Sequence, residues 1–270
     1  MDITTFVIKH RDDALLVGDY NTYRTQLSRQ LLAIRKRLSR STPKTAKYTT
    51  KDAITAEQLG QNHEFAHLIL LTAERAWAHA MRMKSTHAED STGQAISRSI
   101  RNHIVSRLNK AAKSAEELVT LLRDQTVTKA SDIDVLEARA YLASITGAEE
   151  FEKQAEGQRS ADAKASKHRW QKCLRGYSEA RVIYAALLKE TKKDVFREIL
   201  ANTVDPTIRY AAYQAHLPRT IAIATISKKN FPREDPWLVA AVERLDPDAL
   251  RDEITPTPGK SWASLLSNSG

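Results

Sequence analysis

Apolar residues recur at intervals of three and four along most of the chain, a spacing typical of amphipathic helices. Glycine and proline, which interrupt helices, are sparse before residue 218. The pattern predicts a basic loop at Ser39–Lys51, a turn at Ser85–Gly93 and an all-α fold. The predicted helices are Ile3–Val17, Tyr20–Leu38, Thr55–Lys84, Ser97–Asp124, Asp132–Glu152, Trp170–Lys189, Lys193–Thr203 and Pro206–His216.

The second predicted helix has a well-defined apolar face. Asp19 is suited to accept hydrogen bonds from its first turn as an N-cap. Gly18 is suited to end the preceding helix in a left-handed conformation. One buried stripe is expected, because the apolar side chains of the second helix follow one another at intervals of four, three and four residues. The stripe consists of Leu27, Leu31, Ile34 and Leu38.

Positive charge is concentrated in the same region. The chain has 42 Lys and Arg against 33 Asp and Glu, and nine of the basic residues lie between Tyr20 and Lys51, where there is no acidic residue. The other 33 basic residues match the 33 acidic ones, so this segment accounts for the whole net charge of +9. Such a cluster favours a polyphosphate partner, because binding releases condensed counterions. The nine residues are Arg24, Arg29, Arg35, Lys36, Arg37, Arg40, Lys44, Lys47 and Lys51.

Helical spacing distributes these cations around the second helix. It predicts Arg29, Lys36 and Arg40 opposite the apolar stripe, Arg24 and Arg35 along one border, and Arg37 along the other. A second basic stretch lies between Ser91 and Ala115, again without an acidic residue, and we expect it to extend the same surface. Its residues are Arg98, Arg101, Arg107, Lys110 and Lys113.

The absence of acidic residues from the first cluster distinguishes it from an ordinary charged helix face, which mixes signs so that neighbouring side chains pair. Nucleic acid is therefore the favoured partner, and an acidic membrane or protein surface is the alternative. RNA is favoured over DNA, because the sequence contains no helix-turn-helix, zinc-finger or basic-zipper pattern. An arginine-rich helix enters an RNA major groove where a bulge, loop or junction widens it.

The segment from Asp132 to Lys189 resembles one degenerate tetratricopeptide repeat, in which small and large residues alternate so that two helices nest. These residues are Ala138, Tyr141, Gly147 and Phe151 on the first helix, and Trp170, Cys173, Tyr177 and Ala180 on the second. The polar insert Lys153–Lys167 need not be ordered. Six of the eight prolines follow residue 217. The expected organisation is an all-α domain over residues 1–217 and a partly ordered, proline-containing extension over residues 218–270, with Trp262 as one of its anchors.

Enzymatic motifs are weak. The residues His63-Glu64-Phe65-Ala66-His67 match the zinc motif H-E-x-x-H on a predicted helix, but no third ligand stands out downstream, and coincidence is the favoured explanation. There is no glycine-rich phosphate loop and no G-x-S-x-G motif. We therefore expect neither an enzyme nor a cofactor. The single cysteine, and the lack of a signal peptide or of an apolar run near about 18 residues, predict a soluble intracellular protein.

Several segments, in order and at compatible spacing between Asp19 and Gln214, resemble the RNA-binding domain of the 68-kDa subunit of the eukaryotic signal recognition particle. They are Tyr20–Arg24, Ser28-Arg29, Ile34–Lys36, Ala73–Trp77, Ser106–Leu108, Lys110-Ala111, Ala115–Leu118, Asp205-Pro206, Ile208–Tyr210 and Ala212-Tyr213. The resemblance implies a tetratricopeptide-like, non-catalytic domain that binds the particle's RNA near a three-way junction. It also adds Arg75, within Ala73–Trp77, to the expected RNA contacts.

In this family an arginine-rich helix, here Tyr23–Arg40, inserts into a distorted RNA groove and remodels it. The chain departs from the pattern at Gln30–Ala33, where a denser arginine run is expected, and in a long insert at Lys153–Lys167. The resemblance further implies the 72-kDa subunit as a partner through a C-terminal region, which this chain is expected to lack, and indirect contact with the ribosome and the particle's receptor. It implies a cytoplasmic protein that passes through the nucleus or nucleolus, with no small-molecule substrate. The competing interpretation is a tetratricopeptide-like adaptor that binds peptides, with the basic helix as a membrane-surface or nuclear-targeting element.

Overall fold

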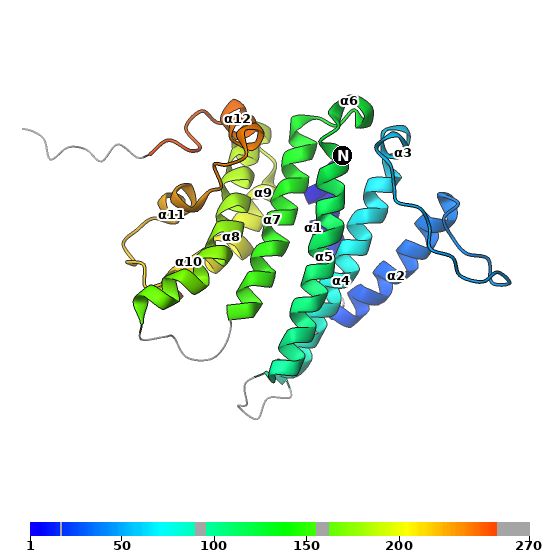
Figure 1. The fold of residues 1–270 in the computed structure, drawn as a ribbon, viewed down its shortest axis with the longest axis horizontal. Helices are drawn as coiled ribbons and strands as arrows, with labels where there is room; N and C mark the ends of the chain where they lie inside the picture. The colour runs from blue at the N-terminus through cyan, green and yellow to red at the C-terminus, as the bar shows by residue number, and fades with distance from the viewer. Residues whose placement is uncertain (17, 90–95, 155–161, 253–270) are drawn as a thin grey trace, which may run out of the picture.

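The computed structural model describes residues 1–16, 18–89, 96–154 and 162–252. All regular secondary structure within these ranges is helical (Figure 1), so the all-α prediction is confirmed. The elements are α1 (Ile3–Leu15), α2 (Tyr20–Arg37), α3 (Ala56–Gln61), α4 (Glu64–Glu89), α5 (Arg98–Leu122), α6 (Gln125–Thr128), α7 (Asp132–Gln154), α8 (Ala163–Thr191), α9 (Asp194–Ile199), the π-helix η1 (Leu200–Val204), α10 (Asp205–Gln214), α11 (Ile223–Asn230) and α12 (Pro236–Leu245).

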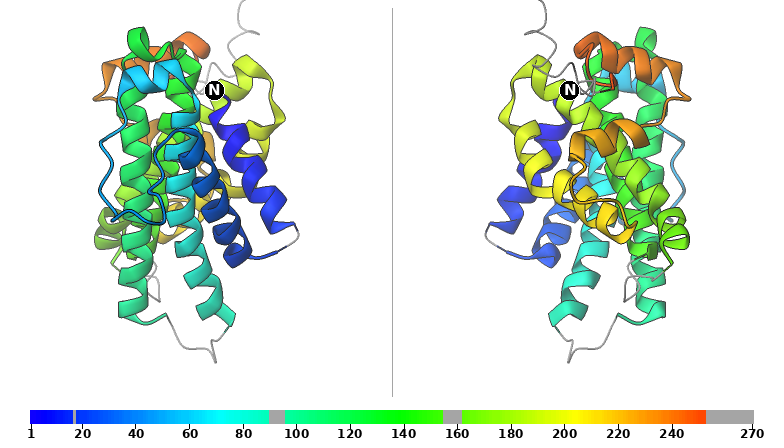
Figure 2. Two further views of the ribbon diagram at one scale, coloured as in Figure 1. Left: turned by 90° about the vertical axis from the view of Figure 1, so that its right-hand side faces the viewer. Right: turned by 90° about the vertical axis from the view of Figure 1, so that its left-hand side faces the viewer.

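The long helices form a row in which each packs against its sequence neighbour. The order α2, α4, α5, α7, α8 runs across Figure 1, with α2 at one end of the row. Helix α1 contacts α2, α7 and α9 and lies against one side of the row (Figure 2). The apolar stripe predicted for α2 forms part of the core, since Leu27, Leu31 and Ile34 are buried together with residues of α4. The opposite face of α2 is thereby left to solvent.

The predicted helical pair corresponds to α7 and α8, and two glycines bring these helices close together. A Cβ atom at Gly176 would lie 2.9 Å from the Cα atom of Gly147 and 3.0 Å from the carbonyl oxygen of Ala143. The ring of Tyr177 occupies the space beside Gly147, where a Cβ would lie 2.7 Å from it. The alternation of small and large residues therefore reflects direct backbone contact between the two helices.

Replacing Gly176 with alanine is expected to destabilise the protein by about 1–2 kcal/mol. Alanine is favoured over glycine in a helix by about 1 kcal/mol, so the clash with the α7 backbone must cost more than this for stability to fall. Urea denaturation followed by circular dichroism measures the change. Lys167→Ala, at an exposed position of the same helix, is the control and should leave the unfolding midpoint nearly unchanged.

The single helix predicted from Thr55 to Lys84 is wrong, because the chain breaks between α3 and α4. Thr55 begins α3 with a reciprocal capping box in which its hydroxyl accepts from the Gln58 amide. Asn62 is extended, and its side chain accepts from the amide of Glu64 at 2.9 Å, which starts α4. The predicted turn at Ser85–Gly93 is also wrong in its first half, since α4 continues to Glu89. Residues 90–93 lie outside the described ranges.

The connection between α1 and α2 differs from the prediction in one respect. Asp19 caps α2 as expected, accepting from the Thr22 amide at 2.8 Å. Gly18 is not in the left-handed region, and Leu16 at the end of α1 keeps right-handed helical torsions. Gly18 is needed for a steric reason instead, because a Cβ atom there would lie 2.7 Å from the Thr22 side chain. Val17 lies outside the described residues.

Both regions expected to be irregular contain helix. Within the insert Lys153–Lys167, α7 continues to Gln154 and α8 begins at Ala163, where Asp162 accepts from two backbone amides, and residues 155–161 lie outside the described ranges. Beyond residue 217, α11 packs on α8, and α12 packs on α7 and α8. Leu238 and Val242 of α12 are buried in the same core as α8. The division at residue 217 remains a prediction, and Trp262 lies outside the described residues.

A buried polar network joins four helices. The Glu74 carboxylate on α4 is 1% exposed and accepts from Arg11 Nε and Nη2 at 2.8 and 2.6 Å. It also accepts from the hydroxyls of Tyr23 on α2 and Tyr141 on α7, each at 2.7 Å. The Arg11 guanidinium lies 3.7 Å from the ring centroid of Trp77. Burial, together with the Glu74 charge, raises the pKa of both tyrosines, which stay protonated and donate. The network fixes α2 against the centre of the protein.

Candidate nucleic-acid interface

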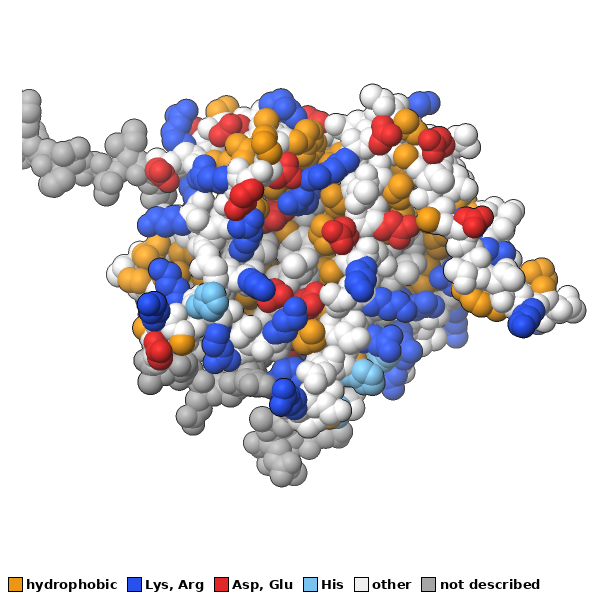
Figure 3. Space-filling view, viewed as in Figure 1, with side chains coloured by type: hydrophobic (Ala, Val, Ile, Leu, Met, Phe, Trp, Pro, Cys, Tyr) orange, Lys and Arg blue, Asp and Glu red, His pale blue; other side chains and the backbone are white. Residues whose placement is uncertain are grey.

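Helices α2, α4 and α5 bring five basic side chains together, which we call the basic strip: Arg24, Arg35, Arg75, His79 and Arg107. Burial, followed by the charges of Arg35 and Arg24, lowers the pKa of Arg75. Burial, followed by the charges of Arg24 and Arg107, lowers the pKa of His79. All five side chains are half-buried, and α4, which carries Arg75 and His79, packs against both α2 and α5. Figure 3 shows Lys and Arg side chains gathered over the region where Figure 1 draws α2, α4 and the lower half of α5.

The strip lacks compensating negative charge. Within the described ranges, no carboxylate forms an ion pair with Arg24, Arg35, Arg75 or Arg107. Like charges held side by side on rigid helices raise the local positive potential and favour an anionic ligand. The strip can therefore hold successive phosphates of a nucleic acid.

The remaining cations of the first cluster lie in three settings. Arg29 and Lys36 are exposed on the outer face of α2, as predicted. Arg37 is exposed but pairs with Glu64 at 3.0 Å, so it has a carboxylate partner from outside the cluster. Lys44, Lys47 and Lys51 are exposed on the segment between α2 and α3.

The predicted position of Arg40 opposite the apolar stripe is wrong. Helix α2 ends at Arg37, and Ser39 has a positive φ of 55°, which turns the chain back. Arg40 is consequently half-buried, and its Nη2 atom donates to the carbonyl oxygen of Asp52. This hydrogen bond closes the two ends of the segment between Arg40 and Asp52 into a loop.

The second basic stretch does not form a single surface. Arg107 belongs to the basic strip through its proximity to His79, and Lys110 is exposed on α5. Lys113 lines a groove formed with α7 and α8, in company with Arg139 and Glu179. Arg98 is exposed and Arg101 half-buried in the first turn of α5. The expected continuity with the first helices is therefore present at Arg107 and absent at Lys113, since the two residues point to different sides of α5.

The residues of the H-E-x-x-H motif have other partners. His63 directly precedes α4, and its carbonyl oxygen accepts from the His67 amide at 3.4 Å, so the two histidines are one turn apart. His67 stacks on the ring of Phe6 with a centroid distance of 4.2 Å, and Glu64 pairs with Arg37. Burial lowers the pKa of His67. Among the described residues, no group of three potential metal ligands comes together.

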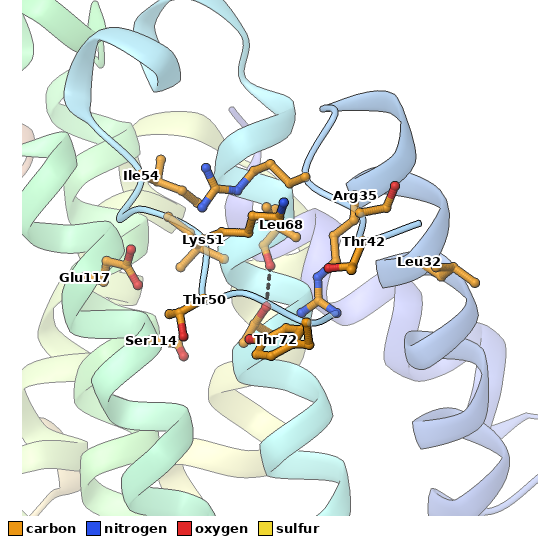
Figure 4. Close-up of a pocket in the computed structure, with 14 residues that line it drawn as sticks. Leu32, Arg35, Thr42, Thr50, Lys51, Ile54, Leu68, Thr72, Ser114 and Glu117 are labelled. Carbon is orange, nitrogen blue, oxygen red and sulfur yellow. Dashed lines mark hydrogen bonds between the residues drawn. The ribbon is translucent and has the colours of Figure 1, made fainter. Parts of the chain in front are cut away.

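A pocket of about 450 Å³ adjoins the basic strip (Figure 4). Arg35 enters it from α2, Thr72 from α4, and Ser114 and Glu117 from α5, while the loop between Arg40 and Asp52 runs across it. The lining residues are Leu32, Arg35, Arg40, Ser41, Thr42, Tyr48, Thr50, Lys51, Ile54, Leu68, Ile69, Thr72, Ser114 and Glu117.

The α5 side of this pocket was not anticipated from the sequence. Burial raises the pKa of Glu117, and the charge of Arg40 opposes this rise. The signal was present in the spacing, because Arg107, Lys110, Ser114 and Glu117 follow one another at intervals of three, four and three and so share one helix face. The carboxylate of Glu117 interrupts the positive charge of this face, so the face does not stand out as a cluster of cations.

No helix among the described residues has the length and apolar content that a membrane span requires.

Comparison with known proteins supports the earlier resemblance. The family model described as RNA-binding signal recognition particle 68 matches residues 15–265. The signal recognition particle subunit SRP68 of Drosophila melanogaster is 29% identical over 202 residues, and that of Dictyostelium discoideum is 23% identical over 205 residues. These matches cover 73% and 74% of this chain but only 29% of each relative.

A solved structure extends the likeness to three dimensions. The SRP68-RBD from Chaetomium thermophilum is 48% identical, with a TM-score of 0.70, over 84% of this chain and 96% of that one. The family model covers most of the chain, and the row of helices agrees with a structure of nearly half identical sequence. The chain therefore belongs to the family of signal recognition particle 68 RNA-binding proteins.

Proposed function

We propose that this chain is a non-catalytic RNA-binding module of a signal recognition particle and that the basic strip contacts the particle's RNA. The observation that carries the proposal is the placement of half-buried Arg24, Arg35, Arg75 and Arg107 on three helices that pack on one another, without carboxylate partners among the described residues. Phosphates at the spacing of a nucleic acid backbone would neutralise such a row, and the released counterions would make the affinity depend steeply on salt.

We infer that α2 enters a widened groove at a junction. A regular A-form major groove is too deep and narrow to admit a helix. Arg24 and Arg35 on the border of α2 can chelate phosphates and stack on unpaired bases, because the guanidinium is planar and presents a fork of donors. Exposed cations around the strip would add phosphate contacts without sequence preference. These are Arg29, Lys36, Arg37, Lys44, Lys47, Lys51, Arg98 and Lys110, with Arg40 closing the adjoining loop. Arg101, which is half-buried, and Lys113, which lies on another side of α5, would contribute only if the RNA extends along that helix.

Binding to two RNAs of equal length and charge tests the proposal. One is a junction-containing fragment of the particle's RNA, and the other is a perfect duplex. We expect tighter binding to the junction at matched salt, with a log–log salt slope corresponding to several phosphate contacts. Equal affinity for the two RNAs would contradict recognition of a junction, and a flat salt dependence would contradict the basic strip as the contact surface.

The affinity for the RNA is expected to rise as the pH falls from 8 to 6, because His79 takes up a proton on binding. The pKa of His79 is lowered in the free protein by burial and by neighbouring cations. RNA phosphates would offset those cations and raise the pKa of His79 in the complex. The gain in RNA affinity is therefore complete below the pKa of the free protein and absent above the pKa of the complex. The expected gain is about threefold to tenfold. His79→Gln should remove this dependence, and His168→Gln on α8 should retain it.

Further protein partners are expected when the chain is part of the assembled particle. The chain spans 29% of the length of the curated relatives it matches. We propose that the 72-kDa subunit binds through sequence outside the described residues, and that the ribosome and the particle's receptor are contacted indirectly. A cytoplasmic location, with passage through the nucleus during assembly, accompanies this role.

A further inference from the structure

The pocket beside the basic strip combines cations and an acceptor in one cavity. Arg35 and Lys51 line it, and Glu117 lies on the α5 side (Figure 4). Within the described part of the chain, the Glu117 carboxylate accepts no hydrogen bond, and the Ser114 hydroxyl makes none. Glu117 is exposed and Ser114 is half-buried, so the carboxylate can be reached from the pocket. An accessible acceptor beside two cations can take a ligand that carries both negative charge and hydrogen-bond donors.

A single nucleotide has this combination of features. Its phosphate would meet Arg35, Arg40 or Lys51, as phosphates elsewhere meet clustered cations. Its base would contact the apolar side chains of Ile54 and Leu68 inside the pocket. Tyr48, which is 74% exposed, offers a further stacking surface. The volume of about 450 Å³ falls within the range of about 300–1,000 Å³ typical of small-ligand pockets.

We propose that this pocket receives one unpaired guanine of the bound RNA, with Glu117 reading its Watson–Crick edge. An ionised carboxylate only accepts hydrogen bonds, through two oxygens side by side. Guanine presents two adjacent donors, N1–H and the N2 amino group, which match that pair. Adenine and cytosine place a ring acceptor beside their amino group, and uracil flanks its single N–H with carbonyls, so each would set an acceptor against the carboxylate. The inference rests on the proposed function, because the guanine belongs to the RNA held by the basic strip.

Inosine substitution combined with a matched pair of variants tests this inference. Inosine lacks the N2 amino group of guanine and otherwise keeps its shape. We would replace each unpaired guanine of the junction-containing fragment in turn and measure affinity for the unaltered protein, Glu117→Gln and Glu116→Gln. One position is expected at which inosine weakens binding to the unaltered protein about tenfold. The same substitution should have no effect on binding to Glu117→Gln, whereas Glu116→Gln, which lines the groove beside α7 and α8, should retain the full loss.

The direction in which each variant changes the RNA affinity distinguishes base recognition from general electrostatics. Removing a carboxylate near RNA raises affinity through the overall field, and Glu116→Gln should do so slightly. Glu117→Gln should instead lower affinity for the unaltered RNA. If no position responds to inosine, or if Glu117→Gln keeps the response, the guanine pocket is overturned while salt-dependent RNA binding stands. If the unaltered protein fails to bind the fragment, the proposed function and the pocket both fall.

Discussion

Replacing Arg24, Arg35 and Arg75 together with glutamine is expected to weaken binding to the junction-containing RNA by at least about 100-fold. Each charge-assisted hydrogen bond to a phosphate contributes about 1.5–3 kcal/mol, so three losses exceed this figure even with partial compensation by neighbouring cations. The salt slope should fall by about 2–3 units, because each phosphate contact adds about 0.7–0.9. Filter binding at several salt concentrations measures both quantities, and glutamine preserves most of the side-chain length that packs between the helices.

A second triple variant with the same change in net charge serves as the control. Lys164, Lys167 and Lys229 are exposed on α8 and α11, away from the basic strip. Their replacement with glutamine should reduce affinity only through the long-range field, by a few-fold at low salt, and should leave the slope nearly unchanged. Equal losses in the two variants would mean that net charge, rather than the strip, governs binding.

Replacing Glu74 with alanine is expected to destabilise the fold by about 3–5 kcal/mol. The substitution leaves the half-buried Arg11 guanidinium without its anion and the hydroxyls of Tyr23 and Tyr141 without an acceptor. For a protein of this size the midpoint of thermal unfolding should fall by about 6–20 °C. Differential scanning calorimetry measures the change. Glu116→Ala, at an exposed position on α5, should shift the midpoint by less than about 2 °C.

A milder variant separates the position of α2 from global stability. Tyr23→Phe removes only the hydroxyl that joins α2 to Glu74, and we expect a loss of about 1–2 kcal/mol. If the network positions α2, affinity for the junction RNA should fall even under conditions where the variant is fully folded. Unchanged affinity would show that packing of Leu27 and Leu31 alone places the helix.

The sequence predicted the helices well where local apolar spacing or a capping residue determines the structure. The stripe of α2 and its Asp19 cap follow directly from apolar spacing and from the preference for an acceptor before the first turn. The packing of the Tyr177 ring of α8 beside Gly147 of α7 follows from the alternation of small and large residues, whereas Gly176 was not in the predicted set. Because these signals are short in range, the structure preserves them.

Features that depend on contacts far apart in sequence were not predictable in the same way. Glu74 directly precedes Arg75 in the sequence, and nothing in its neighbourhood indicates that its partners are Arg11 and Tyr141. The break before α4 depends on Asn62, which is extended and whose side chain accepts from the Glu64 amide, in competition with continuous helical spacing. Arg40 was placed by extending the helical period beyond the point where the helix ends. In each case tertiary structure or capping overrode periodicity.

Helix α2 lies at one end of the row of helices, and this position affects its stability. In arrays where each helix contacts mainly its neighbours, the terminal member has half the support of an inner one and opens first. Here that terminal member carries the dense basic segment. An RNA seated on α2 would occupy the place of the next helix and act as the capping repeat of the array. Recognition and completion of the fold would then be a single event, in which the nucleic acid serves as the last structural layer of the protein.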